Sequence, residues 1–428
     1  MKHGFDRSRL SGPTKAANTP DSASGCCSHA GGCTRRQFLR RSAVVAAARF
    51  LLPHSAFAGE AAPVNTAGAK VAIVSCNEYG AEVRAAMGQA FDLIGGIGSL
   101  VKQKTVTVKV NLTGTDFRRV FARPIGESVM THYSTGLALC GLLFEAGARR
   151  VRFVESTQSR LVLEQSLGEA GWDVNALLAL GKVEFENTRN LGLGKKYSEM
   201  KVPGGGLMFS SFQFNHAYDE TDVMVSLCKL KQHATAGITL SMKNLFGITP
   251  NSIYGDEAGS EMATAGRGLL HTTGWQSDPT IGRYQLPGFK LKRAEEPADP
   301  GIRVPRIVTD ICGARPIHLA LIDGITSMSG GEGPWIGKVA YTKPGVFIAG
   351  LDPVATDAVG AAVMGVANPR AERWTVPLGQ CENGLLLGER TGLGVAEIAK
   401  IDVRGMSVEQ ARCPYPALEA DPPAVKKE

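Results

Sequence analysis

The chain has 428 residues, of which 43% are hydrophobic and 20% are charged, the composition of an ordinary soluble protein with a sizeable core. The formal net charge is +7, but nine of the 47 basic residues and only two of the 40 acidic residues fall in residues 1–58, so the rest of the chain is balanced. A folded part without excess positive charge argues against nucleic-acid binding.

Residues 1–58, the leader of the chain, contain a twin-arginine motif. The stretch TRRQFL places Arg35 and Arg36 before a short, weakly apolar run that ends in AFA. This order matches a twin-arginine signal peptide cleaved after Ala58, the other interpretation being an amphipathic surface helix. Arg49 interrupts the run, which is too short for a stable membrane span. We therefore predict a signal peptide over residues 1–58, the twin-arginine export machinery as a partner, and a periplasmic protein exported in the folded state.

Short apolar segments alternate with helical patterns along residues 59–428, which we predict to form a single large α/β domain. The predicted strands are KVAIVSC, TVTVKVNL, RRVRFVES, DVMVSLCKL, IHLALIDGI and GVFIAG. Helical patterns such as EVRAAMGQAFDLIG, STGLALCGLLFEAGA and RLVLEQSLGEAGW lie between the first strands. This alternation predicts a largely parallel, doubly wound sheet that is covered on both faces.

The alternating pattern fails between about residues 255 and 305, which are rich in Gly, Pro and mixed charge. A segment this long is a lid, an irregular insertion with a small structure of its own, or a surface for a partner. The last residues, about 416–428, have the composition of a flexible tail.

Six of the nine cysteines lie outside the leader, far apart and without a C-x-x-C pair. Most of them fall in apolar patterns, which suits buried thiols. We therefore expect no iron–sulfur cluster.

Polar residues follow several predicted strands at the points where the strands end. Ligands of open parallel sheets bind at the carboxyl ends of the strands, so these residues are candidates for a site, although strand ends are often polar in any protein. The candidates in chain order are Lys109, Asn111, Thr113, Ser156, Thr157, Lys229, Lys231, His233, Asp323 and Asp352.

The densest group lies in VSLCKLKQHATAGITLSMKNLFGITP, residues 225–250. After the opening strand we predict a helix that Thr235 caps and that stops at Gly247, although the alternation in ITLSMK also permits a strand. The amino terminus of such a helix would lie beside Lys231 and His233, and helix N–H groups flanked by cations form an anion site.

Lys243 and Asn244 would lie at the far end of that helix and would join the site only through a bend, for which Gly247 offers a sharp turn. A buried lysine has a lowered pKa, which suits acid–base or covalent work. Each lysine alone is also explained as a surface residue with a buried stem, and His233 alone as a core or capping residue.

The group as a whole predicts an enzyme that acts on a small anionic ligand bearing phosphate or carboxylate. The alternatives are a non-catalytic periplasmic protein that binds a ligand or cofactor, and a maturation partner of another exported protein. The predicted catalytic residues are Lys231, His233 and Lys243, and the predicted ligand-binding residues are Lys109, Asn111, Lys229 and Asn244.

Three aspartates form a second group of candidates. Asp323 ends a predicted strand, and Asp352 precedes Asp357 in the sequence GLDPVATDAV. Carboxylates at strand ends can bind a divalent metal such as Mg²⁺ or Ca²⁺. Asp352 is equally explained as a helix cap, with Pro353 at the first helical position.

Four stretches together resemble the domain-of-unknown-function 362 family: VTVKVNL, residues 225–250, LALIDGITSMSGGEGP and IAGLDPVATDAVGAAVMG. The order K-x-K-x-H, K-N-x-x-G, D-G and D-P-x-x-x-D carries the resemblance, which extends from about Val71 to about Gly405. It implies an α/β fold but no established reaction. Many members of the family carry ferredoxin-like cysteine motifs, which this sequence lacks.

The leader motif generates a prediction about export. Replacing Arg35→Lys together with Arg36→Lys should leave the full-length precursor in the cytoplasm, because the export machinery reads the arginine pair. Fractionation and immunoblotting measure the ratio of precursor to processed chain. Normal processing after Ala58 in the double variant would contradict the assignment.

Overall fold

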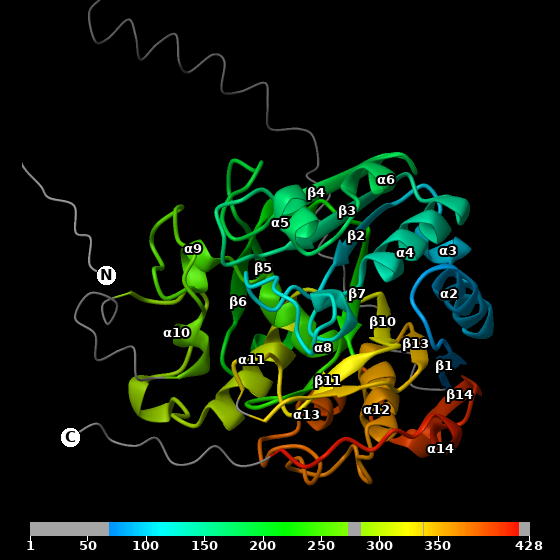
Figure 1. Ribbon diagram of the computed structural model, residues 1–428. Helices are drawn as coiled ribbons and strands as arrows, with labels where there is room; N and C mark the ends of the chain where they lie inside the picture. The colour runs from blue at the N-terminus through cyan, green and yellow to red at the C-terminus, as the bar shows by residue number, and fades with distance from the viewer. Residues whose placement is uncertain (1–67, 273–283, 337, 419–428) are drawn as a thin grey trace, which may run out of the picture. The chain divides into compact units, whose positions relative to one another are not determined.

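The computed structural model describes residues 68–272, 284–336 and 338–418 (Figure 1). They belong to the second of two compact units, Ala61–Glu428, whereas the first unit, Met1–Glu60, lies outside the described residues together with the predicted signal peptide. No helix among the described residues is long and apolar enough to cross a bilayer.

An eight-stranded sheet forms the centre of the second unit. Its strands are β1 (Ala69–Ser75), β2 (Thr105–Lys109), β3 (Arg150–Glu155), β4 (Val183–Asn187), β7 (Val223–Lys229), β10 (Leu319–Gly324), β13 (Val346–Gly350) and β14 (Ile401–Gly405). They are ordered β14-β1-β13-β10-β7-β2-β3-β4. The remaining strands form three two-stranded sheets: β5 (Ser198–Lys201) with β6 (Ser211–Phe214), β8 (Lys231–His233) with β9 (Gly237–Thr239), and β11 (Ser327–Ser329) with β12 (Ala340–Thr342).

The prediction of a largely parallel α/β sheet is confirmed, with one strand as an exception. β13 pairs antiparallel with both β1 and β10, whereas all other neighbours in the large sheet are parallel. The connection from β10 to β13 contains the β11–β12 hairpin and no described helix. A parallel neighbour would need a crossover, usually a helix, whereas an antiparallel neighbour does not, so β13 returns in the opposite direction.

Helices cover both faces of the sheet. The longer ones are α2 (Ala81–Leu93), α4 (Tyr133–Glu145), α5 (Leu163–Glu169), α6 (Val174–Leu178), α11 (Pro300–Ala314), α12 (Pro353–Val363) and α13 (Gly384–Arg390). Short ones are α3 (Gly98–Val101), α7 (His216–Asp219), α8 (Ser241–Asn244), α9 (Asn251–Tyr254), α10 (Gly268–His271) and α14 (Val408–Ala411), with 3₁₀ turns η1 (Ile125–Glu127), η2 (Pro203–Gly205), η3 (Leu245–Ile248), η5 (Arg293–Glu295) and η6 (Ile398–Lys400).

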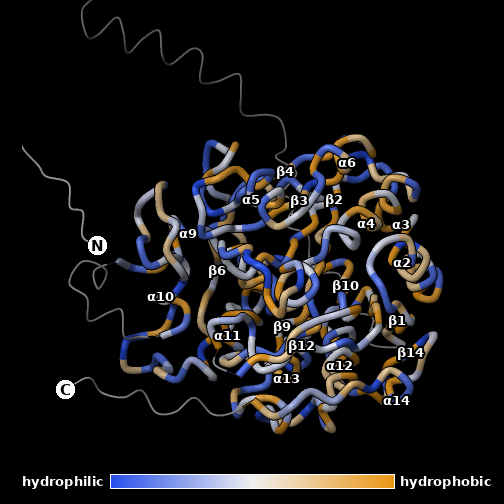
Figure 2. The backbone as a smooth tube through the Cα atoms, in the orientation of Figure 1, coloured by the Kyte–Doolittle hydropathy of each residue, from blue (hydrophilic) through white to orange (hydrophobic). Residues whose placement is uncertain are grey.

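Two hydrophobic clusters lie on opposite faces of the sheet because strand side chains alternate. On β1, Ala72 and Val74 pack with helices α2, α4, α5 and α6, whereas Val71 and Ile73 pack with α8, α11, α12 and α13. Figure 2 shows the apolar residues along the sheet and on the helices that face it. The central strands are buried on both sides, which accounts for their nearly continuous apolar sequences.

The helix predicted from Thr235 to Gly247 is wrong in its first part. The β8–β9 hairpin comes first, and only then do α8 and η3 follow (Figure 1). Gly237 allows the hairpin to turn, because its φ of +79° is a backbone conformation that other residues rarely adopt. Of the stretch ITLSMK, Ile238 and Thr239 belong to β9, whereas Ser241, Met242 and Lys243 belong to α8.

The irregular segment predicted at residues 255–305 contains short elements where the structure describes it. α10 and η5 lie within it, and α11 begins at Pro300, a residue that suits the first turn of a helix. Residues 273–283, in the middle of the segment, lie outside the described residues.

A fully buried ion pair links the two central strands β7 and β10. Lys229 Nζ lies 3.3 Å from Asp323 Oδ2, and neither side chain is exposed to solvent. The ammonium also donates to Tyr79 Oη at 2.6 Å and to the Gly126 carbonyl at 3.1 Å. All three donors of the ammonium are thereby satisfied, as burial of a charge requires.

Removing the carboxylate should destabilise the protein severely. Asp323→Ala leaves the Lys229 charge buried without compensation, and we expect a loss of about 3–5 kcal/mol in the free energy of unfolding. Replacing both partners with apolar residues, Lys229→Met with Asp323→Leu, should recover most of this loss.

Denaturant unfolding measures both effects, and Asp402→Ala provides the matched control. Asp402 pairs with Arg404 on β14, where both side chains are partly exposed, so this change should cost less than about 1 kcal/mol. Equal losses in the Asp323 and Asp402 variants would contradict the role given to the buried pair.

Candidate functional site

Lysines gather at the carboxyl end of the sheet, and Lys109 on β2 is the first of them. Its ammonium is buried and lies 2.7 Å from Glu155 Oε1 at the end of β3. It also donates to the Val110 carbonyl at 2.7 Å and to Asn244 Oδ1 at 3.2 Å. Burial lowers the pKa of Lys109 and the Glu155 charge opposes this change. With three acceptors, this ammonium has no donor left for a ligand.

The ammonium of Lys231 on β8 also has three hydrogen-bond acceptors. Its buried ammonium donates to Thr113 Oγ1 at 3.1 Å, to the Val129 carbonyl at 2.7 Å and to the Glu332 carbonyl at 2.9 Å. Burial lowers its pKa to about 7. These contacts tie β8 to three loops, so Lys231, a predicted catalytic residue, has a positioning role within the structure and no free donor.

Lys243 on α8 is the exception among these lysines. It is partly buried, and the described residues offer its ammonium neither a hydrogen bond nor an ion pair. The nitrogen lies 4.3 Å from the centroid of the Phe246 ring. Burial lowers the pKa of Lys243 to about 7, and the charges of Arg267 and Lys109 contribute in the same direction. Lys243 is therefore the lysine that can bind a ligand or exchange a proton near neutral pH.

Two asparagines of the predicted ligand-binding set, Asn111 and Asn244, lie beside Lys109. Asn111 Nδ2 donates to Asn244 Oδ1 at 3.3 Å, and Asn244 Nδ2 donates to Ser226 Oγ at 3.0 Å. The Asn111 Oδ1 atom is buried and has no hydrogen-bond partner in the part of the chain that the structure describes. A buried acceptor without a partner is costly, so it marks a position where a ligand donor would be stabilising.

His233 has a defined tautomer. Its Nδ1 atom accepts a hydrogen bond from the Thr235 backbone N–H at 3.1 Å, so a neutral ring carries its hydrogen on Nε2. Burial and the nearby charge of Lys243 hold the pKa of His233 well below its usual range. The neutral ring therefore presents an Nε2–H donor.

Arg267, just before α10, belongs to this site but was not predicted. Its Nε and Nη2 atoms donate to oxygen atoms of Thr249, Ser156 and Asn251. Its Nη1 atom forms no hydrogen bond with the described residues. The arginine is thus fixed at one side of its guanidinium and open at the other.

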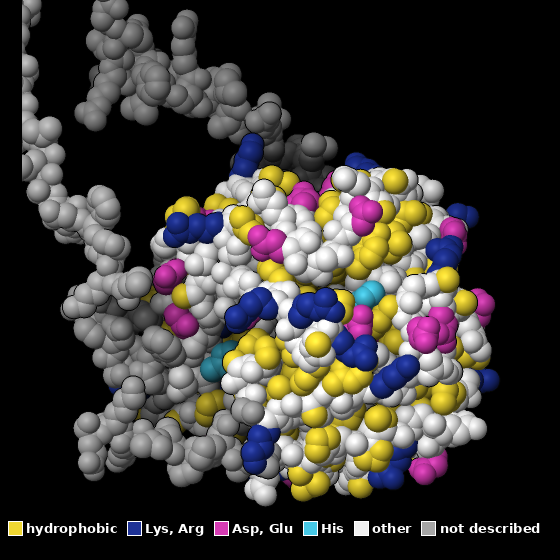
Figure 3. Space-filling view, viewed as in Figure 1, with side chains coloured by type: hydrophobic (Ala, Val, Ile, Leu, Met, Phe, Trp, Pro, Cys, Tyr) yellow, Lys and Arg dark blue, Asp and Glu magenta, His cyan; other side chains and the backbone are white. Residues whose placement is uncertain are grey.

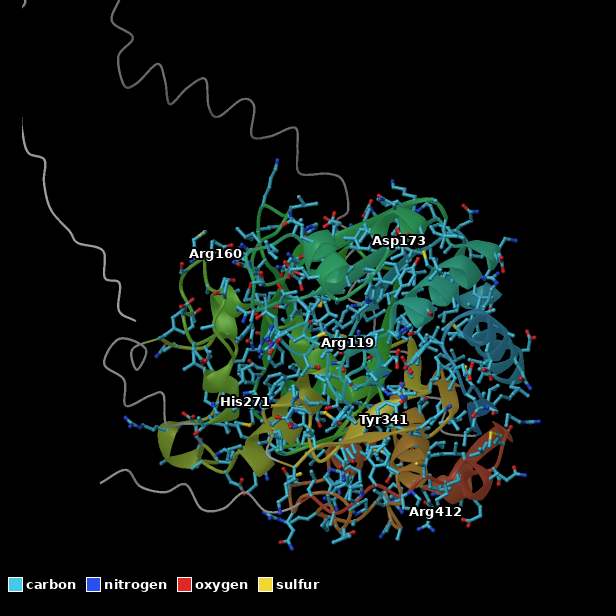
Figure 4. The ribbon with its side chains drawn as sticks, in the orientation of Figure 1. Arg119, Arg160, Asp173, His271, Tyr341 and Arg412 are labelled. Carbon is cyan, nitrogen blue, oxygen red and sulfur yellow. The ribbon has the colours of Figure 1, made fainter. Side chains whose placement is uncertain are left out.

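His271 on α10 also belongs to the site and was not predicted. Its ring packs against Phe246 with a centroid separation of 4.9 Å, and Figure 4 labels its position. Its Nδ1 atom lies 2.8 Å from the Arg267 carbonyl, which can only accept, so Nε2 is left as an acceptor. Burial lowers the pKa of His271 to about 4, with Lys243 contributing. The spacing of Arg267 and His271, one helical turn apart in GRGLLH, was the available signal.

Asp357, a predicted metal ligand, holds α8 in place. Its carboxylate accepts from the Ser241 N–H at 2.8 Å, the Ser241 hydroxyl at 2.6 Å and the Met242 N–H at 2.9 Å. The first N–H groups of α8 thus bind a side chain of the protein itself, whereas the helix start predicted at Thr235 as an anion site is part of the β8–β9 hairpin.

The other two predicted metal ligands are also engaged. Asp352 caps α12 by accepting from the Ala355 N–H at 2.8 Å, which is the alternative that the sequence offered, and Asp323 pairs with Lys229. Among the described residues no group of three or more His, Cys, Asp or Glu side chains is arranged to hold a metal ion. The predicted metal site therefore finds no ligand set there.

Gly247 has a different function from the sharp turn that the sequence suggested. Its φ is not positive, but a Cβ atom there would lie 2.9 Å from Lys109 Nζ and 3.0 Å from Glu155 Oε1. The glycine therefore allows η3 to approach the buried ion pair closely.

Basic side chains also gather on the surface in front of this edge. Figure 3 shows them in the middle of the face, where Figure 4 labels Arg119. Arg118, Arg119 and Arg123 follow Thr113, to which Lys231 donates. Each has an acceptor within its own segment, so these arginines are surface residues of an ordered loop.

The chain belongs to the domain of unknown function family DUF362, whose profile matches residues 106–362. No curated protein sequence matches it.

Two solved structures resemble part of the chain. The lactate racemase apoprotein of Thermoanaerobacterium thermosaccharolyticum is 13% identical with a TM-score of 0.33, over 64% of this chain and 54% of that one. A protein of Thermotoga maritima is 14% identical with a TM-score of 0.33, over 64% of this chain and 55% of that one. The chain thus spans little more than half the length of each.

The close approach at Gly247 generates a prediction about stability. Gly247→Ala forces the Lys109–Glu155 pair apart, and we expect a loss of about 1–3 kcal/mol. Gly168→Ala is the matched control, because Gly168 lies inside α5 with no atom within 4 Å of the added Cβ. That change should be neutral or stabilising by up to about 1 kcal/mol. Thermal unfolding measures both, and an unchanged midpoint for Gly247→Ala would refute the constraint.

Proposed function

We propose that the protein is an enzyme that binds a small anionic compound, bearing a carboxylate or phosphate group, at the carboxyl edge of the sheet. One observation carries the proposal: Lys243 and Arg267 are both cationic at this edge, and neither forms an ion pair with the described residues. Two cations that repel each other in a partly buried site favour the binding of an anion.

The remaining charges at the edge do not compensate these two cations. Glu155 is committed to Lys109, and Asp323 is committed to Lys229. Glu332 raises the pKa of Lys243, but its two oxygens accept hydrogen bonds from the Ala234 N–H at 3.0 Å and the Trp335 indole N–H at 3.4 Å. A bound anion would therefore supply negative charge, and Asn111 Oδ1, which has no partner among the described residues, would accept a hydrogen bond from a hydroxyl or N–H group elsewhere on the ligand.

The two histidines favour an enzyme. His233 offers an Nε2–H donor and His271 offers an Nε2 acceptor. The charge of Lys243 lowers the pKa of both rings. A donor, an acceptor and a lysine that titrates near neutral pH are the groups that general acid–base catalysis needs. We further propose, from the leader motif, that the protein acts in the periplasm after export in the folded state.

A non-catalytic binding protein is the second candidate. The saturation of Lys109, Lys229 and Lys231 favours it, because three of the four lysines serve the fold and have no donor left for chemistry. The two candidates differ in turnover: an enzyme converts the bound anion, and a binding protein releases it unchanged.

Anion binding should be measurable as stabilisation. Millimolar sulfate should raise the melting temperature, because a ligand at a hundred times its dissociation constant contributes about 2.7 kcal/mol. Lys243→Gln should remove most of this rise. Lys182→Gln is the matched control, since Lys182 is exposed at the amino end of β4, away from the site.

The same stabilisation should depend on pH in a defined direction. Lys243 must be protonated to pair with the anion, and its pKa is about 7, so the sulfate-dependent rise should be larger at pH 6 than at pH 8. Sulfate keeps its charge over this range. A rise that is unchanged in Lys243→Gln would refute the proposed site.

A further inference from the structure

The amine of Lys243 differs from the other lysines of the site in its hydrogen bonding, and this difference affects its reactivity. Ammonium groups that are fully hydrogen-bonded, as at Lys109 and Lys231, are held in one place by their acceptors. Lys243 instead rests on the ring of Phe246 with no acceptor among the described residues. Its nitrogen is therefore free to lose a proton and to move toward a bound molecule.

Groups that could serve a reaction at this nitrogen lie around it. The Phe246 ring contacts both the Lys243 ammonium and the His271 ring, so both side chains lie next to the same aromatic ring. The Nε2 atom of His271 is an acceptor, and the Nε2 atom of His233 carries a hydrogen. One ring can accept a proton and the other can donate a hydrogen bond to an oxygen.

Arg267 supplies a place for a negative charge next to this amine. Its Nη1 atom forms no hydrogen bond with the described residues, whereas Thr249 and Ser156 accept hydrogen bonds from its Nε and Nη2 atoms. A rigid guanidinium with free N–H groups recognises a carboxylate or phosphate. The site thus combines an anchored anion receptor with an amine that has no hydrogen-bond or ion-pair partner among the described residues.

We infer that the ligand is a small oxo acid or a related anionic carbonyl compound, and that Lys243 forms an imine with its carbonyl carbon. This inference rests on the proposed function, because it names the substrate class of the same site. Arg267 holds the acidic group, and His233 donates to the carbonyl oxygen.

The covalent step is balanced without any further reactant. The lone pair of the Lys243 nitrogen forms a bond to the carbonyl carbon, and the carbonyl π electrons move to the oxygen. His271 Nε2 carries two protons in turn to this oxygen: first the proton that the ammonium gives up to expose its lone pair, and then one from the nitrogen after it has bonded to the carbon. The oxygen then leaves as water while the C=N bond forms. The ammonium and the carbonyl compound thus give a protonated imine and one water, with no change in oxidation state.

Reductive trapping tests the inference on the full-length protein. Glyoxylate is the probe, sodium cyanoborohydride reduces any imine to a stable secondary amine, and peptide mass spectrometry locates the adduct. We expect Lys243 to be labelled roughly a hundredfold faster than Lys182 at pH 7. A pKa about three units below that of an exposed lysine leaves far more free amine, and lower nucleophilicity offsets part of this gain.

The comparison of two lysines in one folded sample does not depend on the stability of a variant. Acetaldehyde, which lacks the acidic group, should lose most of the preference for Lys243, and sulfate should protect Lys243 from glyoxylate but leave Lys182 unaffected. Labelling of Lys243 should level off above about pH 7.

Two failures can be told apart. If sulfate stabilises the protein through Lys243 but glyoxylate labels Lys243 no faster than Lys182, the imine inference is wrong and the anion site stands. If sulfate neither stabilises the protein through Lys243 nor protects it, the proposed function is wrong and the inference is lost with it.

Discussion

A buried ammonium group needs three acceptors, and this requirement organises the carboxyl edge of the sheet. Inside a protein a charge without hydrogen bonds costs several kcal/mol, so each buried lysine draws oxygen atoms around it. Lys109 joins β2 to β3, Lys229 joins β7 to β10, and Lys231 joins β8 to the segments of Val129 and Glu332. The lysines thereby fix the relative positions of the elements that build the candidate site.

The same requirement separates lysines that look alike in the sequence. Because three of them have all their donors satisfied by the fold, Lys243 and Arg267 are left as cations that form no ion pair with the described residues. Supporting contacts hold α8, which carries Lys243: Asp357 binds its first N–H groups, and Gly247 lets the following turn approach the Lys109–Glu155 pair. These contacts hold α8 in place, so the Lys243 amine stays at a position where the described residues offer it no hydrogen bond or ion pair.

Much of the fold could be predicted, because it follows from periodicity. Strands such as those at Thr105–Lys109 and Val346–Gly350 are buried on both faces, and the intervening helices have a different spacing of apolar residues. The direction of β13 could not be predicted, because direction depends on the length and content of a connection. The helix expected after Thr235 failed because ITLSMK fits two periods, and contacts between distant residues, such as Gly237 with Trp374, decide between them.

The sequence by itself determined the family, the α/β class and the chain segments that meet at the carboxyl edge, because these depend on local pattern and on the order of motifs. Only the tertiary structure decided which lysine is free, that Asp357 caps α8, and that Arg267 and His271 join the site from a segment without a regular pattern. Hydrogen-bond saturation is a property of acceptors that are distant in the chain: Lys231 finds its oxygens at Thr113, Val129 and Glu332. The sequence of residues 225–250 does not contain those acceptors. The hydrogen bonding of each lysine, and with it the chemistry open to its amine, therefore depends on the tertiary structure.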